Sequence, residues 1–225
     1  MARGGGNGVG ADVDVFWVGP ENSGGIEDAY HYDEGPSGTF QLVAPGSSTP
    51  TFQPRQIVAV SRASNTMEMW YIGRDGSIQD SYYYDGSGWN SFTLAPAGSA
   101  TTYEGAISAV SRASNTMELW YIGANNSVQD KYYFDGSGWN GFTLSGSGSA
   151  QSAIVAVAPS AGAMSVTWNA YGQGWLDNAS FAPWTVDQIS PGGPSTLGAV
   201  TAVSQSSGVN VFEVTDNGGI EEYTK

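Results

Sequence analysis

The sequence predicts an all-β protein, a β-propeller built from four-stranded antiparallel blades, with five repeats in the chain. Three observations predict it: a nearly identical pair of 42-residue segments, two sequence markers that recur five times, and four strand-like runs in each repeat. Radial repetition of small four-stranded sheets, in units of about 40–50 residues, is typical of propellers. A β-sandwich is the alternative, but a sandwich does not require identical units.

The repeat is clearest in the middle of the chain. Residues 59–100 and 109–150 differ at 11 of 42 positions, so 31 positions are identical. The first marker, an apolar strand start, begins at Val13, Met67, Met117, Met164 and Val209. The second marker begins at Ile26, Ile78, Val128, Trp175 and Ile220. The spacing between successive copies shortens along the chain in the same way for both markers. This predicts a single domain over residues 1–225, with copies at about 11–50, 51–100, 101–150, 151–195 and 196–225.

Each repeat resolves into four runs rich in β-branched and aromatic residues. In the second copy these runs are residues 57–61, 67–73, 78–84 and 92–95. Asp75-Gly76 between the second and third runs predicts a type I′ hairpin. The first copy starts at its second strand (residues 13–18) and the last ends at its third (residues 220–225). We expect each terminal copy to lack one strand, and an unpaired strand edge favours a homo-oligomer.

The composition excludes several classes of protein. The chain has 21 acidic and 7 basic residues, a net charge of −14, which disfavours binding to nucleic acid. No cysteine and a single histidine, His31, leave no thiolate nucleophile and no zinc ligand set, so we predict no metal, cofactor or catalytic residue. No apolar run approaches a membrane span, and no signal peptide is visible. The localisation stays open between the cytoplasm and non-classical secretion.

A recurring polar set stands out against the apolar strands. Glu68 and Trp70 share one face of the second strand of their repeat, and a carboxylate among apolar neighbours needs a partner. Arg62 lies six residues upstream, across a hairpin turn. The same positions in the third copy are Arg112, Glu118 and Trp120. The pair is either a buried structural ion pair or a sugar site, in which arginine donates to sugar oxygens and glutamate accepts from two hydroxyls.

Two further positions recur. Trp89 and Trp139 lie in a glycine-rich turn, where an indole is more exposed than in a core and offers a flat face to a sugar. The alternative is that each indole packs at a blade edge. Asp80 and Asp130 recur as well, and a carboxylate found in every copy is expected to accept hydrogen bonds from turn amides. Their predicted counterparts are Asp28, Asp177 and Glu222.

The two middle repeats resemble bacterial β-propeller lectins of the Photorhabdus type and, more distantly, fungal fucose-binding propellers of the Aleuria type. Ser-Arg, Met-Glu-x-Trp-Tyr-Ile-Gly and Gly-Trp occur in this order in both repeats, with Asp-Gly-Ser-Ile-Gln-Asp in the first of them. The resemblance implies sugar sites between adjacent blades, for fucose or related methylated sugars. It implies that these sites contain Arg62, Glu68 and Trp89, and again Arg112, Glu118 and Trp139.

The function predicted is a multivalent carbohydrate-binding lectin whose partners are fucosylated or methylated glycans. Its expected ligand-binding residues are Arg62, Glu68, Trp70, Trp89, Arg112, Glu118, Trp120 and Trp139. The alternatives are a non-catalytic protein-interaction propeller and, less favoured, a glycoside hydrolase. A hydrolase needs one unique pair of carboxylates, whereas this chain repeats its carboxylates.

Overall fold

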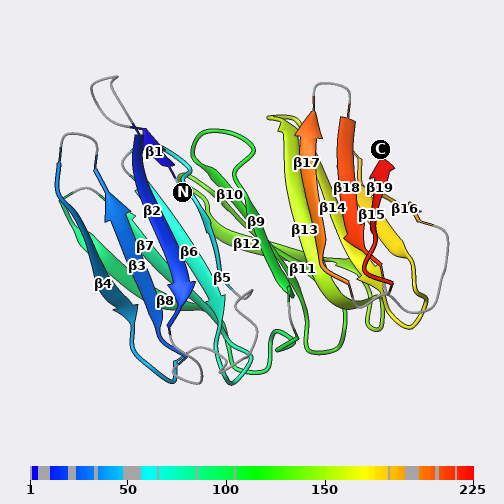
Figure 1. Ribbon diagram of the computed structural model, residues 1–225, viewed down its shortest axis with the longest axis horizontal. Coiled ribbons are helices and arrows are strands. Elements are labelled where there is room, and N and C mark those ends of the chain that lie inside the picture. The colour runs from blue at the N-terminus through cyan, green and yellow to red at the C-terminus, as the bar shows by residue number, and fades with distance from the viewer. Residues whose placement is uncertain are drawn as a thin grey trace. The chain divides into compact units, whose positions relative to one another are not determined.

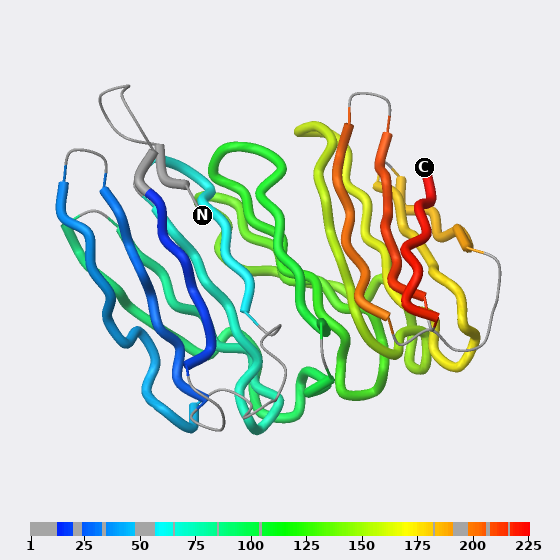
Figure 2. The backbone as a smooth tube through the Cα atoms, in the orientation of Figure 1, coloured from blue at the N-terminus to red at the C-terminus, as the bar shows by residue number. Residues whose placement is uncertain are grey.

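The computed structural model describes residues 2–4, 11–19, 24–32, 35–47, 57–64, 66–84, 86–103, 105–181, 183–190, 198–205, 208–215 and 217–225. These residues form five small antiparallel sheets, one for each predicted repeat (Figure 1). The chain divides into two compact units, residues 1–102 and 103–225. Within each sheet the strands follow one another in chain order, and the backbone runs up and down through them (Figure 2).

Unit 1 holds the first two sheets. The first contains β1 (Ala2–Gly4), β2 (Ala11–Val18), β3 (Ile26–His31) and β4 (Ser37–Val43). The second contains β5 (Ile57–Val60), β6 (Thr66–Ile72), β7 (Ile78–Tyr84) and β8 (Gly88–Ala95).

Unit 2 holds the other three sheets. The third contains β9 (Ile107–Val110), β10 (Thr116–Ile122), β11 (Val128–Phe134) and β12 (Gly138–Ser145). The fourth contains β13 (Ala150–Ser160), β14 (Ala163–Ala170), β15 (Leu176–Ser180) and β16 (Thr185–Gln188). The fifth contains β17 (Val200–Gln205), β18 (Gly208–Val214) and β19 (Ile220–Thr224).

The expectation that both terminal sheets lack a strand is wrong for the first sheet. β1 pairs with β2, so the first sheet has four strands. Sequence reasoning missed β1 because the tripeptide Ala-Arg-Gly carries no alternating pattern. In the fifth sheet the described residues form three strands, with β19 at its edge.

The second strand of each middle sheet is covered on both faces. All seven residues of β6 are buried, which explains why its sequence reads as a continuous apolar run around one glutamate. On one face Met69 and Tyr71 pack against Ile26 and Val43 of the first sheet. In unit 2 the fourth and fifth sheets meet similarly, through Leu176, Val209 and Val211. Sheets packed face to face therefore form the core of each unit.

The hairpin between β6 and β7 differs from the type predicted. A type I′ turn needs positive φ at two central residues, but of Asp75 and Gly76 only Gly76 has it, at 76°. The Gly76 amide donates to the Gly73 carbonyl at 2.9 Å and the Gly73 amide to the Ser77 carbonyl at 2.8 Å. These bonds define a three-residue loop that ends in a glycine bulge, because Asp75 caps the Ser77 amide instead of adopting a left-handed conformation.

Candidate functional site

The loop between the first and second strands of each middle sheet presents the arginine. In the second sheet the Thr66 hydroxyl donates to the Ala63 carbonyl at 2.9 Å and accepts from the Ala63 amide at 3.2 Å. The Ser61 hydroxyl donates to the Thr66 carbonyl at 2.8 Å. Thr116 and Ala113 repeat the threonine bonds in the third sheet. These short-range bonds fix the loop, and with it the arginine between the serine and the alanine.

Arg62 and Glu68 lie together, and both are buried. Arg62 Nε is 3.6 Å from Glu68 Oε1, an ion-pair distance. A second guanidinium nitrogen, Nη2, donates to the Tyr84 hydroxyl at 2.8 Å, and the guanidinium carbon lies 5.4 Å from the centre of the Tyr84 ring. The sequence-predicted pair therefore exists, and a tyrosine of β7 completes it.

Arg112 and Glu118 form a tighter pair in the third sheet. Arg112 Nε donates to Glu118 Oε1 at 2.5 Å, and Nη1 donates to the Ala161 carbonyl of the fourth sheet at 3.2 Å. The guanidinium carbon lies 5.7 Å from the Phe134 ring and 5.2 Å from the Phe181 ring. One ring comes from the same sheet and the other from the next sheet, so this arginine lies at the junction of two sheets.

The tryptophan on this junction was not the one predicted. Ser180 pairs with Thr185, so Phe181 and Trp184 occupy the fourth-sheet positions of Tyr133 and Trp139. The Trp184 ring lies 5.2 Å from Trp120 and 5.1 Å from Phe181, the residue that stacks on Arg112. Sequence reasoning missed Phe181 and Trp184 because the fourth copy has diverged from the two middle copies. The signal available in the sequence was an aromatic residue, Phe181, three positions before Trp184.

Trp89 and Trp139 lie in strands, not in turns. Each is the second residue of an outer strand, β8 or β12, because glycines with positive φ close the hairpin early. Trp89 lies 5.8 Å from Phe16 of the preceding sheet and 5.7 Å from Tyr83 of its own sheet. Trp139 lies 5.6 Å from Tyr133. The described ring contacts thus place Trp89 toward the preceding sheet, as Trp184 is placed toward Trp120.

Trp70 and Trp120 have no exposed surface. Trp70 Nε1 donates to Asp80 Oδ2 at 2.8 Å, and Trp120 packs edge-on against Phe142 at 5.8 Å. Both indoles are therefore part of the buried interior of their sheets.

Asp80 and Asp130 do not accept hydrogen bonds from turn amides, contrary to expectation. Asp80 accepts from the Trp70 indole, since the two residues are cross-strand partners. Both carboxylate oxygens of Asp130 are buried without a hydrogen-bond partner among the described residues. Burial, followed by the nearby charge of Glu118, raises the pKa of Asp130 to about 9. Asp130 is therefore protonated at neutral pH.

The predicted equivalence of Asp177 is wrong by one position. Buried Leu176, which begins β15, is the counterpart of Ile78, which begins β7. The residue two positions later is Asn178, so Asn178 and not Asp177 has the place of Asp80; it pairs with Thr167. The Asn178 amide donates to Ser165 Oγ at 2.6 Å and to Thr167 Oγ1 at 2.7 Å. The fourth sheet therefore has a neutral network where the middle sheets have charged pairs.

The Arg112 cluster, which we define as Arg112, Glu118, Phe142, Phe181 and Trp184, combines three kinds of recognition chemistry. The guanidinium is a fork of donors, the carboxylate is a double acceptor, and the aromatic rings offer apolar faces. The Arg112 side chain is 16% exposed and Phe142 is 37% exposed, so the cluster reaches solvent. Such a set suits a neutral molecule with hydroxyl groups on one side and C–H groups on another.

Among the residues that the structure describes, no group of three His, Cys, Asp or Glu side chains could hold a metal ion. The described part of the chain also has no helix with the length and hydrophobicity needed to cross a bilayer.

Comparisons with solved structures find β-propeller lectins. A lectin from Burkholderia pseudomallei has a TM-score of 0.78 and 19% sequence identity, over 94% of this chain and 62% of the lectin. The six-bladed fungal lectin of Aleuria aurantia has a TM-score of 0.63 and 18% identity, over 95% of this chain and 70% of the lectin. The SapL1 lectin was solved in complex with α-methyl fucoside. It has a TM-score of 0.67 and 19% identity, over 94% of this chain and 72% of the SapL1 chain.

This chain spans about 62% of the length of the Burkholderia lectin. No protein-family model matches the chain, and no curated protein matches it in sequence. Similarity at this level of identity shows the fold. The chain is an all-β protein whose five antiparallel sheets resemble propeller blades.

Proposed function

We propose that this protein is a carbohydrate-binding lectin, that its five sheets are blades of a β-propeller, and that sugars bind between adjacent blades. The proposed ligands are fucose and related methylated sugars. The structurally similar proteins are lectins, and one of them was solved with α-methyl fucoside.

The Arg112 cluster is the observation that carries the proposal. Arg112 and Glu118 come from the third sheet, while Phe181 and Trp184 come from the fourth. In the proposed complex Arg112 donates to ring and hydroxyl oxygens and Glu118 accepts from two hydroxyls. The aromatic rings cover the C–H face of the sugar. The site thus needs two neighbouring blades.

The arginine–glutamate pair occurs twice, so we propose two such sites in this chain. The other three sheets have Asp14, Ser165 and Asn210 at the position of the glutamate. Single sugar sites are weak, and linked copies raise avidity without a new contact. Duplication of the middle repeats fits this requirement.

A glycan array followed by calorimetry on purified protein tests the function. We expect binding to fucosylated glycans, competed by free fucose, without hydrolysis of aryl glycosides. Glu68→Ala together with Glu118→Ala should abolish agglutination, because losing a hydrogen-bonded charged acceptor costs about 1.5–3 kcal/mol, or roughly 10- to 150-fold in affinity per site.

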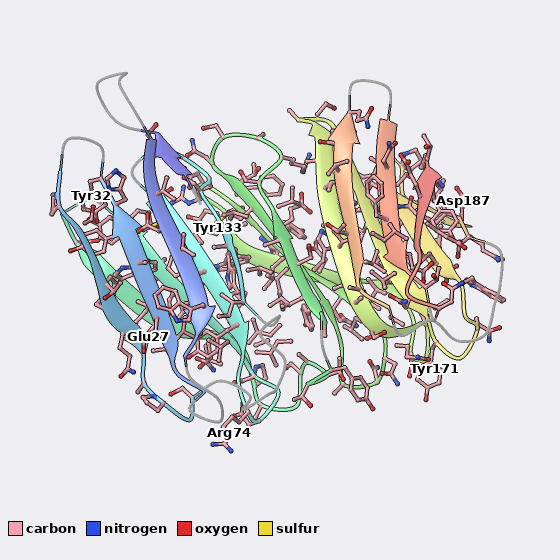
Figure 3. The ribbon with its side chains drawn as sticks, viewed as in Figure 1. Glu27, Tyr32, Arg74, Tyr133, Tyr171 and Asp187 are labelled. Atoms are coloured by element: carbon pink, nitrogen blue, oxygen red, sulfur yellow. The ribbon has the colours of Figure 1, made fainter. Side chains whose placement is uncertain are left out.

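Glu27→Ala is the matched control. Glu27 projects from β3 (Figure 3) and accepts from Gln41 at 3.1 Å on an exposed face. The control should agglutinate like the parent. Unchanged sugar affinity in the folded double variant would falsify the site, and an array without binding, or turnover of a glycoside, would contradict the function.

A further inference from the structure

The two arginine–glutamate pairs differ in geometry although their repeats are nearly identical. Of the 11 differing positions, one is in described ring contact with the arginine: Tyr84 in the second copy and Phe134 in the third. The arginine-to-ring distances are similar, 5.4 and 5.7 Å. Among the described ring contacts within their own sheets, the two arginine environments therefore differ by one hydroxyl group, while Arg112 also contacts Ala161 and Phe181 of the fourth sheet.

The hydroxyl group changes what the arginine binds. Arg62 donates to the Tyr84 hydroxyl at 2.8 Å, and its Nε stays 3.6 Å from Glu68, beyond hydrogen-bond length. Phe134 offers no acceptor, and Arg112 Nε donates to Glu118 at 2.5 Å. The guanidinium is a rigid planar fork, so an orientation that satisfies the tyrosine moves Nε away from the carboxylate.

The two glutamates consequently lie in different electrostatic surroundings. The titratable and charged groups facing Glu68 from described elements are Arg62, Asp80, Tyr82 and Tyr84. Those facing Glu118 are Arg112, Asp130 and Tyr132, with Lys131 beyond Asp130.

In both sheets the arginine opposes a rise in the pKa of the glutamate. Burial, followed by the charge of Asp80, raises the pKa of Glu68 far above its ordinary value. Burial also raises the pKa of Glu118, but the hydrogen bond and charge of Arg112 oppose the rise. In the third sheet the proton resides on Asp130. The shorter Arg112–Glu118 contact therefore favours the ionised form of Glu118 more strongly than the longer Arg62–Glu68 contact favours that of Glu68.

We propose that the residue at position 84 or 134 makes the two sites unequal: Phe134 leaves Arg112 bonded to Glu118 and gives the tighter sugar site, whereas the Tyr84 hydroxyl takes a donor of Arg62, holds Nε away from Glu68 and weakens its site. This inference rests on the proposed lectin function. An ionised carboxylate accepts two charge-assisted hydrogen bonds from sugar hydroxyls, and a carboxyl group that keeps its proton loses part of this capacity.

The first test needs no sugar. The glutamate side chains are labelled with ¹³C at the carboxyl carbon and titrated by NMR, with Glu68→Gln and Glu118→Gln used for assignment. Tyr84→Phe should lower the Glu68 midpoint by about one pH unit or more, and Phe134→Tyr should raise the Glu118 midpoint similarly. Midpoints that move in neither variant overturn the inference.

The second test measures affinity at one site at a time, with methyl α-fucoside as the probe. Arg112→Ala leaves the Tyr84 site and Arg62→Ala leaves the Phe134 site. The Phe134 site should bind tighter, by about 5- to 10-fold. Adding Tyr84→Phe to the first protein should tighten it, and adding Phe134→Tyr to the second should weaken it, each by a similar factor.

The outcomes separate this inference from the proposed function. Loss of affinity on Tyr84→Phe would show that the tyrosine hydroxyl holds the sugar, which overturns the inference while the function stands. If the carboxyl midpoints move but neither single-site protein binds any sugar, the proposed function fails and the affinity difference with it. The shift of the carboxyl midpoints would then stand as a structural property alone.

Discussion

Buried carboxyl groups are the residues whose behaviour depends most on their immediate neighbours. Asp80 has the Trp70 indole as a donor, whereas Asp130 has no hydrogen bond from a described residue. A buried charge without a partner is costly, so Asp130 keeps its proton in the folded state, while in the unfolded chain it titrates near pH 4. The folded state then binds more protons than the unfolded state between these two pKa values.

This proton makes stability fall as pH rises. Its contribution is fully present below about pH 4 and is lost as pH rises through the folded pKa of about 9. Asp130→Asn mimics the neutral form, so it should raise the melting temperature at pH 8 and flatten its fall between pH 5 and 8. One proton corresponds to about 1.4 kcal/mol per pH unit, or roughly 3–6 °C for a chain of this size.

Scanning calorimetry from pH 5 to 8 measures this slope. Asp187→Asn is the control, since Asp187 lies on β16 (Figure 3) with its side chain 59% exposed, in an ion pair with Lys225. An exposed pair contributes little, so the control should keep the parent slope. A parent protein whose melting temperature rises over this range would show that Asp130 is ionised in the fold.

At the scale of elements, strand positions were predictable and the partners of the site were not. Continuous apolar runs around a repeated glutamate locate β6 and β10, because both faces of these strands are buried. The pairing of Arg112 with Phe181 needs two sheets, and spacing along the chain carries no information on what faces a side chain across a junction. The degenerate fourth copy also hid the shift from Asp177 to Asn178.

The β6–β7 hairpin provides a prediction at this scale. Gly76 has φ of 76°, and a Cβ there would lie 2.8 Å from the Ala100 carbonyl oxygen. Gly76→Ala should therefore lower the free energy of unfolding by about 1–3 kcal/mol in urea denaturation. Asn126 has the same place in the third sheet, with φ of 62°. Asn126→Gly should change stability by less than about 1 kcal/mol, and equal effects of the two changes would refute this account.

At the scale of the molecule, the described residues pair β19 on one side only. Its described neighbour is β18, and Ile220 on it is 74% exposed. Unpaired strand edges recruit other strands, so we predict a homo-oligomer. The interpretation of the five sheets as one ring likewise stays a prediction, because each unit has its own core.

Light scattering tests the assembly. The parent should have a mass that is a multiple of 23.5 kDa, and Ile220→Lys, which places a charge on the edge, should shift it toward 23.5 kDa. Tyr171→Lys is the control, because Tyr171 lies in a turn (Figure 3) and is 47% exposed. A parent mass near 23.5 kDa would exclude association through β19.

The near identity of the second and third sheets has a consequence for how the chain folds. β6 and β10 differ at one of seven residues, Met69 against Leu119. During folding β6 therefore finds almost the same cross-strand partners on β11 as on β7, and a chain that exchanges them satisfies every local hydrogen bond in the wrong topology. Divergence of the outer copies removes this ambiguity for the rest of the molecule. Duplication of nearly identical repeats thus adds kinetic traps, and each further identical repeat would add more.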